Sequence, residues 1–226
     1  MGYAIILSGG VGTRLGLDIP KQYVKVKDKT ILQYVVEKIE ACTLIQGYVI
    51  VAAEEWQDDI LSMMNLSEKF IGFAASGENR QLSIYHGLLE LKKVAKDHDL
   101  VLVQDAARPN TSDDLLLRCM QLDDSVDGAM PVLPMKDTVY ISHTGSRVDE
   151  LLNRDEVFAG QAPESFRFGK YLWANEMLLP VDILHINGST EPAVRAGMNI
   201  ALIEGEESNF KITTAADLER FSQLNK

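Results

Sequence analysis

The sequence predicts an α/β protein built on a mostly parallel, doubly wound sheet. Short apolar runs at 3–7, 48–53 and 100–103 have the length and the β-branched content of strands buried on both faces. Segments with helical spacing of apolar residues separate these runs, as crossover helices do in parallel sheets. A chain of 226 residues, 46% hydrophobic and 24% charged, can bury such a core as a single domain over 1–226.

The first part of the chain alternates strands and helices. A helix follows Thr30, which suits an N-cap, and Gly47 separates it from the next strand. A second capped helix follows Ser112 and ends at Met120. The predicted strands are 3–7, 48–53, 70–75, 100–103 and 128–134, and further helices are predicted over 56–64 and 80–94.

The pattern changes from Asp137 onward. Residues 138–142 and 147–152 flank a tight turn at 143–146, which predicts a β-hairpin that forms an arm over about 137–156. Such a hairpin serves as an arm, a lid or a dimer contact, although a simple edge hairpin is nearly as common. The predicted elements after it are a helix over 166–179, a short helix opened by 187–192, a strand at 199–203 and a terminal helix capped by Thr213 or Thr214.

Composition limits the possible partners. The 33 acidic residues exceed the 22 basic ones and give a net charge of −11, which argues against a nucleic-acid polymer or an anionic membrane surface. Cys42 and Cys119 are too few for a disulfide framework and lack metal-ligand spacing. Because no signal peptide and no run of 18 apolar residues is visible, we expect a cytoplasmic protein without a membrane partner.

The loop after the first strand predicts a phosphate site. Ser8 and three glycines, Gly9, Gly10 and Gly12, remove side-chain bulk where the strand ends, so that backbone N–H groups can form an anion-attracting nest. Arg14 and Lys21 add two cations near this nest. The loop is not a Walker loop, because no Gly-Lys-Ser/Thr follows, and it lacks the acidic residue of a dinucleotide fingerprint.

Three other predicted strand ends carry polar residues that belong at the same edge of the sheet. Asp105 suits a magnesium-bound carboxylate or a plain turn aspartate, and Arg108 suits a phosphate contact or a partner of Asp105. Lys211 suits a site-facing ammonium or an exposed lysine of an edge strand. The turn at 77–83 suits a base or ribose contact, or an ordinary capped helix start, through Gly77, Arg80 and Ser83.

Taken in order, these motifs resemble the cytidylyltransferases that act on polyol phosphates, which include the methylerythritol-phosphate and ribitol-phosphate branches. The resemblance spans nearly the whole chain. It rests on the segments 8–14, 20–23, 105–109, 160–163 and 209–213. It implies a Rossmann-like nucleotidyltransferase fold, a homodimer built through the hairpin arm, and Mg²⁺-dependent transfer of CMP from CTP with release of pyrophosphate.

The resemblance also implies residue roles. Arg14 and Lys21 hold the triphosphate, Lys211 neutralises the α-phosphate, and these three form the catalytic set, while Asp105 ligates Mg²⁺. The implied nucleotide contacts are Ser8, Gly9, Gly10, Gly12, Thr13, Gly77, Glu78, Arg80, Ser83 and Ala107. The implied polyol-phosphate contacts are Arg108, Thr138, Arg154 and Ser189, with Arg154 reaching the site of the partner subunit.

The acceptor half departs from the methylerythritol branch. Ser189-Thr190-Glu191-Pro192 stands where that branch has Thr-Asp-Glu-Ala, and Ala162 replaces a threonine. Ser208 replaces an acidic residue, as in the ribitol-phosphate branch. Even with these departures we expect methylerythritol 4-phosphate as the acceptor, with ribitol 5-phosphate or another polyol phosphate as the alternative. Two other hypotheses are a sugar-phosphate nucleotidyltransferase that uses another nucleotide and a non-catalytic nucleotide-binding module.

Overall fold

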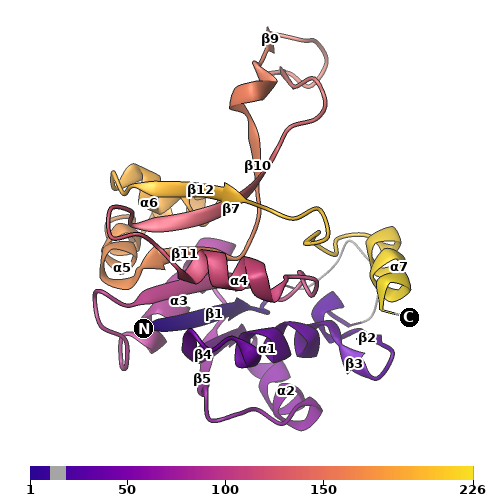
Figure 1. The fold of residues 1–226 in the computed structure, drawn as a ribbon, viewed down its shortest axis with the longest axis vertical. Coiled ribbons are helices and arrows are strands. Elements are labelled where there is room, and N and C mark those ends of the chain that lie inside the picture. Colours follow the sequence, from indigo (N-terminus) through magenta and orange to yellow (C-terminus); the bar gives the residue numbers. More distant parts are fainter. Residues whose placement is uncertain (11–18, 226) are drawn as a thin grey trace.

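A computed structural model describes residues 1–10 and 19–225 of the chain (Figure 1). Its described part is organised around a sheet of eight strands in the order β10-β7-β11-β6-β1-β4-β5, with β12 also paired to β7. The strands are β1 (Gly2–Leu7), β4 (Ile45–Ala52), β5 (Phe70–Ala75), β6 (Leu100–Asp105), β7 (Gly128–Pro134), β10 (Phe158–Gly160), β11 (Glu164–Arg167) and β12 (Ile200–Glu204). Two small hairpins pair β2 (Lys25–Val26) with β3 (Lys29–Thr30) and β8 (Tyr140–Ile141) with β9 (Glu150–Leu151).

The sheet is covered by helices on both faces. The α-helices are α1 (Ile31–Ala41), α2 (Gln57–Met63), α3 (Arg80–Leu91), α4 (Asp113–Met120), α5 (Phe168–Glu176), α6 (Glu191–Arg195) and α7 (Ala215–Leu224). Short 3₁₀ turns are η2 (Lys21–Tyr23), η3 (Glu54–Trp56), η4 (Arg154–Glu156) and η5 (Asp182–His185). None of the helices in the described ranges is both long enough and apolar enough to span a bilayer.

The prediction of a mostly parallel, doubly wound sheet is confirmed. Strands β5, β4, β1 and β6 lie parallel, and β12 is parallel to β7. Leu7 pairs with Val51 on one side and with Asp105 on the other, so the carboxyl ends of three strands finish together. This alignment brings the loops after β1, β4 and β6 to one edge of the sheet, where open α/β sheets bind ligands.

Two buried cores flank the sheet. On one face α1 and α4 pack against Ile6, Ile50 and Leu102, and on the other α3 and α5 pack against Ile5 and Val103. The alternation of Ile5 with Ile6 and of Leu102 with Val103 follows the two-residue period of a strand, which sends neighbouring side chains to opposite faces. The continuous apolar runs seen in the sequence are therefore strands buried on both sides.

The second half of the chain differs from the prediction. The helix predicted from Phe166 begins at Phe168, because residues 164–167 form β11, which pairs antiparallel with both β6 and β7. The predicted hairpin exists, but its strands are only two residues long. It forms the tip of an arm that extends beyond β7 and β10 and stands away from the sheet (Figure 1).

Candidate active site

A cavity of about 550 Å³ opens at the carboxyl ends of the parallel strands. Its walls come from the segments 7–10, 21–22, 76–83, 105–107 and 211–213. Segments that are distant in the sequence thus converge on one pocket, as the sheet topology requires. Of the predicted catalytic residues, Lys21 and Lys211 line it, and Arg14 lies outside the described residues together with Gly12 and Thr13.

The described start of the glycine loop packs closely against the end of β5. A Cβ atom on Gly9 would lie 2.7 Å from the Cβ of Ser76, which is closer than two carbon atoms approach. The Gln22 amide Nε2 donates to the carbonyl oxygens of Ser8 and Gly10, at 2.6 and 2.8 Å. Gln22 thereby holds the backbone at this edge of the pocket, a role that the sequence did not suggest. Ser8 itself is buried, with its hydroxyl 3.2 Å from that of Tyr23.

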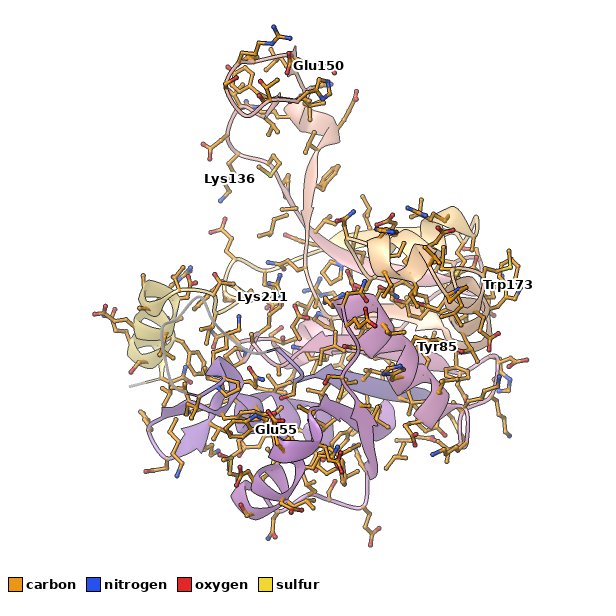
Figure 2. All side chains as sticks on the ribbon, turned by 180° about the vertical axis from the view of Figure 1, so that it is seen from behind. Glu55, Tyr85, Lys136, Glu150, Trp173 and Lys211 are labelled. Atoms are coloured by element: carbon orange, nitrogen blue, oxygen red, sulfur yellow. The ribbon has the colours of Figure 1, made fainter. Side chains whose placement is uncertain are left out.

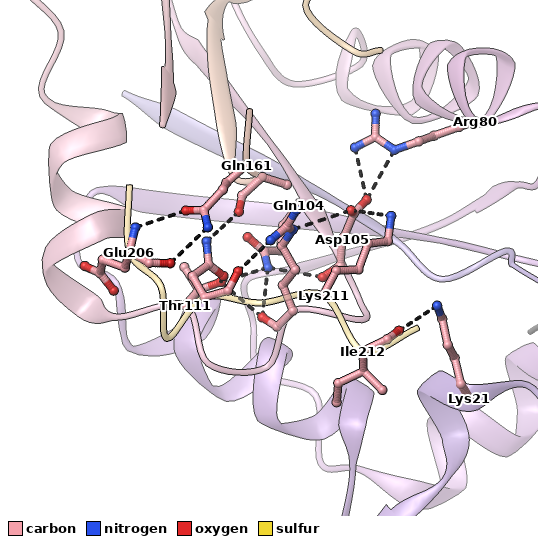
Figure 3. Close-up of polar contacts among 12 residues, drawn as sticks. Lys21, Arg80, Gln104, Asp105, Thr111, Gln161, Glu206, Lys211 and Ile212 are labelled. Atoms are coloured by element: carbon pink, nitrogen blue, oxygen red, sulfur yellow. Dashed lines mark hydrogen bonds and ion pairs between the residues drawn. The ribbon is translucent and has the colours of Figure 1, made fainter. Parts of the chain in front are cut away.

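Lys21 and Lys211, which come from opposite ends of the chain, are linked because Lys21 binds the residue that follows Lys211. The Lys21 ammonium donates to the Ile212 carbonyl at 2.7 Å (Figure 3). The Ile212 amide donates in turn to the Ala107 carbonyl at 2.8 Å. Lys211, the residue before Ile212, extends toward Asp105. The pocket therefore gathers two cations at one wall, and this arrangement suits a chain of phosphate groups.

Asp105 is the centre of the charged cluster. Its Oδ1 accepts hydrogen bonds from Nε and Nη2 of Arg80, at 3.2 and 3.0 Å. Its Oδ2 lies 2.7 Å from Nζ of Lys211 and 3.8 Å from Nε of Arg108. Burial opposes ionisation of this carboxyl, but the three cations outweigh it and hold the pKa of Asp105 well below its usual range.

The start of α3 forms a second wall of the pocket. The Asn79 side chain caps the helix by accepting from the Leu82 amide at 2.8 Å. The Gly77 amide donates to the Ser83 hydroxyl oxygen at 2.9 Å, and a Cβ on Gly77 would lie 2.6 Å from the Cβ of Leu82. Glu78 is exposed at this wall. Glycine at position 77 therefore lets this turn pack tightly against Leu82, and the turn places Gly77 and Ser83 at the wall of the cavity.

The predicted acceptor contacts lie elsewhere. Arg108 directs Nη1 to the Asn209 carbonyl at 2.5 Å and does not line the cavity. Ser189 is buried, and its carbonyl accepts from the Tyr171 hydroxyl at 2.7 Å. Thr138 and Arg154 are exposed on the arm.

Arg154 contacts another residue of the arm. Its Nη1 donates to the Lys136 carbonyl at 3.1 Å, and Figure 2 shows Lys136 part-way along the arm and Glu150 at its tip. Within one described chain, the arm residues and the pocket are therefore separate.

A buried polar network fixes the segment that carries Lys211. Asn209 is fully buried; its Nδ2 donates to the Ala162 carbonyl at 2.8 Å and its Oδ1 accepts from the Thr111 hydroxyl at 3.0 Å. Gln104 Nε2 donates to the same Thr111 oxygen at 3.1 Å (Figure 3). These bonds join the end of β6, the turn before β11 and the chain near its C-terminus, so they set where Lys211 meets Asp105.

Glu164, at the start of β11, is a charged residue that sequence reasoning missed. It is 8% exposed, and its Oε2 receives no hydrogen bond from the described part of the chain. Its Oε1 accepts a long hydrogen bond of 3.4 Å from the Thr190 hydroxyl. Burial raises the pKa of Glu164 to about 7, although Arg80 opposes the shift.

Comparison with known proteins decides the family. The family model described as IspD, 2-C-methyl-D-erythritol 4-phosphate cytidylyltransferase, matches residues 3–223. The chain belongs to this family. Members of the IspD family are CTP-dependent cytidylyltransferases, so the protein is an enzyme of nucleotidyl transfer, and the resemblance found in its motifs is confirmed.

Individual relatives agree with the family model. The 2-C-methyl-D-erythritol 4-phosphate cytidylyltransferase of Clostridium botulinum (strain Langeland) is 34% identical over 221 residues, 95% of this chain and 93% of the relative. That of Petrotoga mobilis is 29% identical over 222 residues, 97% and 96% of the two chains. The crystal structure of the Francisella tularensis IspD enzyme, 27% identical, superposes with a TM-score of 0.82 over 98% of both chains. The cavity described above therefore lies in a fold shared with solved IspD enzymes.

Proposed function

We propose that the protein transfers CMP from CTP to 2-C-methyl-D-erythritol 4-phosphate. The observation that carries the proposal is the meeting of Lys21, Lys211 and Asp105 in one cavity, whose wall also includes Gly9, Gly10 and the turn before α3. Relatives that match nearly the whole chain bear the name of this activity. A cavity of about 550 Å³ falls within the usual range of small-ligand sites, roughly 300–1,000 Å³.

The reaction joins two polyanions. An oxygen of the acceptor phosphate attacks the α-phosphorus of CTP, the bond between the α-phosphorus and its bridging oxygen breaks, and pyrophosphate leaves with that electron pair. The attacking oxygen is already anionic, so no strong general base is required. Lys211 is suited to neutralise the α-phosphate, and Lys21 with Arg14 to hold the leaving pyrophosphate. Catalysis then comes from positioning and charge stabilisation.

Asp105 is the residue we assign to a bound Mg²⁺. No group of three His, Cys, Asp or Glu side chains that could hold a metal is present among residues 1–10 and 19–225. A single buried carboxylate nevertheless fits, because Mg²⁺ is commonly held by one or two carboxylates together with substrate phosphates. When bound, the ion would screen the charge that repels the incoming acceptor phosphate.

We further propose that the arm completes the acceptor site of a partner subunit. The described arm carries Thr138 and Arg154 away from the cavity of its own chain, and it exposes the apolar side chains of Tyr140, Val148 and Leu151. An arm that stands away from the body and exposes three large apolar side chains suits a self-complementary dimer contact. In such a dimer, Arg154 would supply positive charge to the acceptor phosphate.

One assay tests the substrate assignment. Pyrophosphate release is measured with CTP and, side by side, the 4-phosphate of methylerythritol, ribitol 5-phosphate, erythritol phosphate and glycerol phosphate. We expect methylerythritol 4-phosphate to give the highest kcat/KM. Ribitol 5-phosphate as the better acceptor would instead assign the departures at Ala162, Ser189 and Ser208 to that branch. A parallel panel of four nucleoside triphosphates contradicts the proposal if CTP is not preferred.

A further inference from the structure

Two buried carboxylates face the same side of the sheet near the cavity. Glu164 of β11 pairs with Val103 of β6, and side chains alternate along a strand, so Glu164, Val103 and Asp105 point to one face. Helix α3 covers this face, since its residue Ile84 shares a core with Val103. Arg80, the first residue of α3, therefore reaches a region that contains both carboxylates.

The two carboxylates differ in how many hydrogen bonds and ion pairs they receive. Asp105 receives both Arg80 hydrogen bonds and the Lys211 ammonium. Glu164 has only the long Thr190 contact at Oε1, and its buried Oε2 has no donor within the described residues. Arg80 is the strongest attractive charge acting on Glu164, yet it forms its ion pair with Asp105. A buried carboxylate oxygen without a partner is costly, so its retention calls for a function.

The Arg80 contact also obstructs the role proposed for Asp105. A divalent cation that binds Asp105 would lie beside the guanidinium now bonded to Oδ1, and two cations at that separation repel strongly in a low-dielectric site. A long, flexible arginine side chain that is 33% exposed can change its conformation without unfolding the helix that carries it.

We propose that Glu164 is a positioning residue that receives the Arg80 guanidinium when a divalent cation and the nucleoside triphosphate occupy Asp105. The exchange frees Oδ1 of Asp105, gives Oε2 of Glu164 a donor and keeps Arg80 paired. This inference rests on the proposed function, because it concerns the loading of the same site. It makes Glu164 an outer partner of the metal ligand, which tunes binding without touching the metal or the substrate.

The test compares CTP binding in EDTA and in excess Mg²⁺ by isothermal titration calorimetry. We expect Glu164→Gln to bind CTP as the wild type does in EDTA, because Arg80 then stays on Asp105. Mg²⁺ should increase the CTP affinity of the wild type, and we expect this increase to be about tenfold smaller in Glu164→Gln. Outer partners of metal ligands change affinity by roughly 10–100-fold. Asp99→Asn is the matched control, because Asp99 is a buried carboxylate directly before the opposite end of β6. It should follow the wild type, and Glu164→Asp should recover part of the Mg²⁺ effect.

The outcomes separate this inference from the proposed function. An equal Mg²⁺ enhancement in wild type and Glu164→Gln overturns the exchange and leaves the cytidylyltransferase proposal standing. An equal loss in EDTA and in Mg²⁺ assigns Glu164 a structural role and also overturns it. A wild type that does not bind CTP in either condition overturns both proposals. If Glu164→Gln does not fold, the test is a crystal structure of the wild type with Mg²⁺ and a non-hydrolysable CTP analogue. An Arg80 side chain still bonded to Asp105 in that complex would overturn the proposed exchange.

Discussion

Lys211 has two partners at different stages of the proposed reaction. In the structure it neutralises Asp105, and with CTP bound it would face the α-phosphate. We expect Lys211→Ala to lower kcat by roughly 10²–10³-fold, by analogy with removal of one donor that stabilises transition-state charge. Steady-state pyrophosphate release measures this effect. Lys25→Ala, at an exposed lysine of β2, should leave kcat unchanged, and near-normal turnover of Lys211→Ala would remove that residue from the reacting centre.

The burial of Glu164 predicts a pH dependence of stability. The folded state holds the proton more tightly, because the pKa of Glu164 rises from 4.5 to about 7. Between these values the folded chain retains a proton that the unfolded chain releases, so the free energy of unfolding falls as pH rises. The loss amounts to about 3 kcal/mol at 1.36 kcal/mol per pKa unit.

Urea unfolding in metal-free buffer at pH 5 and pH 8 tests this prediction. Glu164→Gln lacks the titrating group, so its stability relative to wild type should increase between the two pH values by about that amount. Identical pH profiles for the two proteins would show that Glu164 is not buried as the structure places it.

The site residues differ in how well the sequence alone predicts them. Asp105 was predictable because it comes two residues after a run of four apolar residues, where a buried strand is expected to end and ligands bind in α/β sheets. Glu164 was not, because its burial depends on β11 pairing with β6 and β7, which are distant in the chain. A polar residue after Pro163 carries no local sign of that environment.

Helix α7 shows how a terminal element supports the site. Thr214 accepts from the Asp217 amide at 3.2 Å, and the Asp217 carboxylate accepts from the Thr214 amide at 2.8 Å, which forms a capping box. Burial opposes ionisation of Asp217, but hydrogen bonds from Thr213 and Thr214 outweigh it and lower its pKa to about 2. The helix buries Phe221 against Val26 and Ile31, so it anchors the segment just after Lys211.

Loss of this cap should be measurable without loss of the fold. We expect Thr214→Ala to reduce the free energy of unfolding by about 1 kcal/mol, the usual cost of removing an N-cap hydroxyl. Urea midpoints at constant m-value measure the change. Ser222→Ala removes an exposed hydroxyl from the same helix and should be neutral or slightly stabilising. Equal midpoints for wild type and Thr214→Ala would mean that the cap does not hold α7.

Elements were predictable where local pattern and tertiary pairing agree. Strands β5 and β7 have the predicted bounds, and the buried runs of β1, β4 and β6 were found within a few residues. Strand β10 was missed and the last two residues of β11 were assigned to a helix, because each strand has at most four residues and exists only through antiparallel pairing with strands formed earlier in the chain. Short strands of this kind lack a period long enough to recognise.

At the scale of the molecule, the described part of one chain leaves three large apolar side chains of the arm exposed. Tyr140, Val148 and Leu151 are 55%, 64% and 60% exposed, and Figure 2 shows the arm well apart from Lys211. We expect wild type to sediment at twice 25.1 kDa and Leu151→Asp to shift toward the monomer in analytical ultracentrifugation, because burial of a charged side chain opposes association. Leu224→Asp, at an equally exposed leucine of α7, is the control. A monomeric wild type would remove the arm from the proposed mechanism.

Subunit mixing tests whether Arg154 serves the neighbouring site. If Arg154 acts across the interface, Lys211→Ala disables the cavity of its own chain and Arg154→Ala disables the cavity of the partner chain. A heterodimer of the two variants then contains one cavity with an intact Lys211 and an intact Arg154 donated by the other chain. Random reassociation makes half the dimers mixed, each with one working site of two, so we expect roughly a quarter of wild-type kcat per subunit.

If Arg154 acted within its own chain, these mixed dimers would have no working site. A mixed dimer would then keep one working site only when both changes lie in the same chain. Coexpression of the double variant Lys211→Ala/Arg154→Ala with wild type therefore provides the reciprocal arrangement. Action across the interface leaves its mixed dimers without a complete site, and action within one chain leaves them with one.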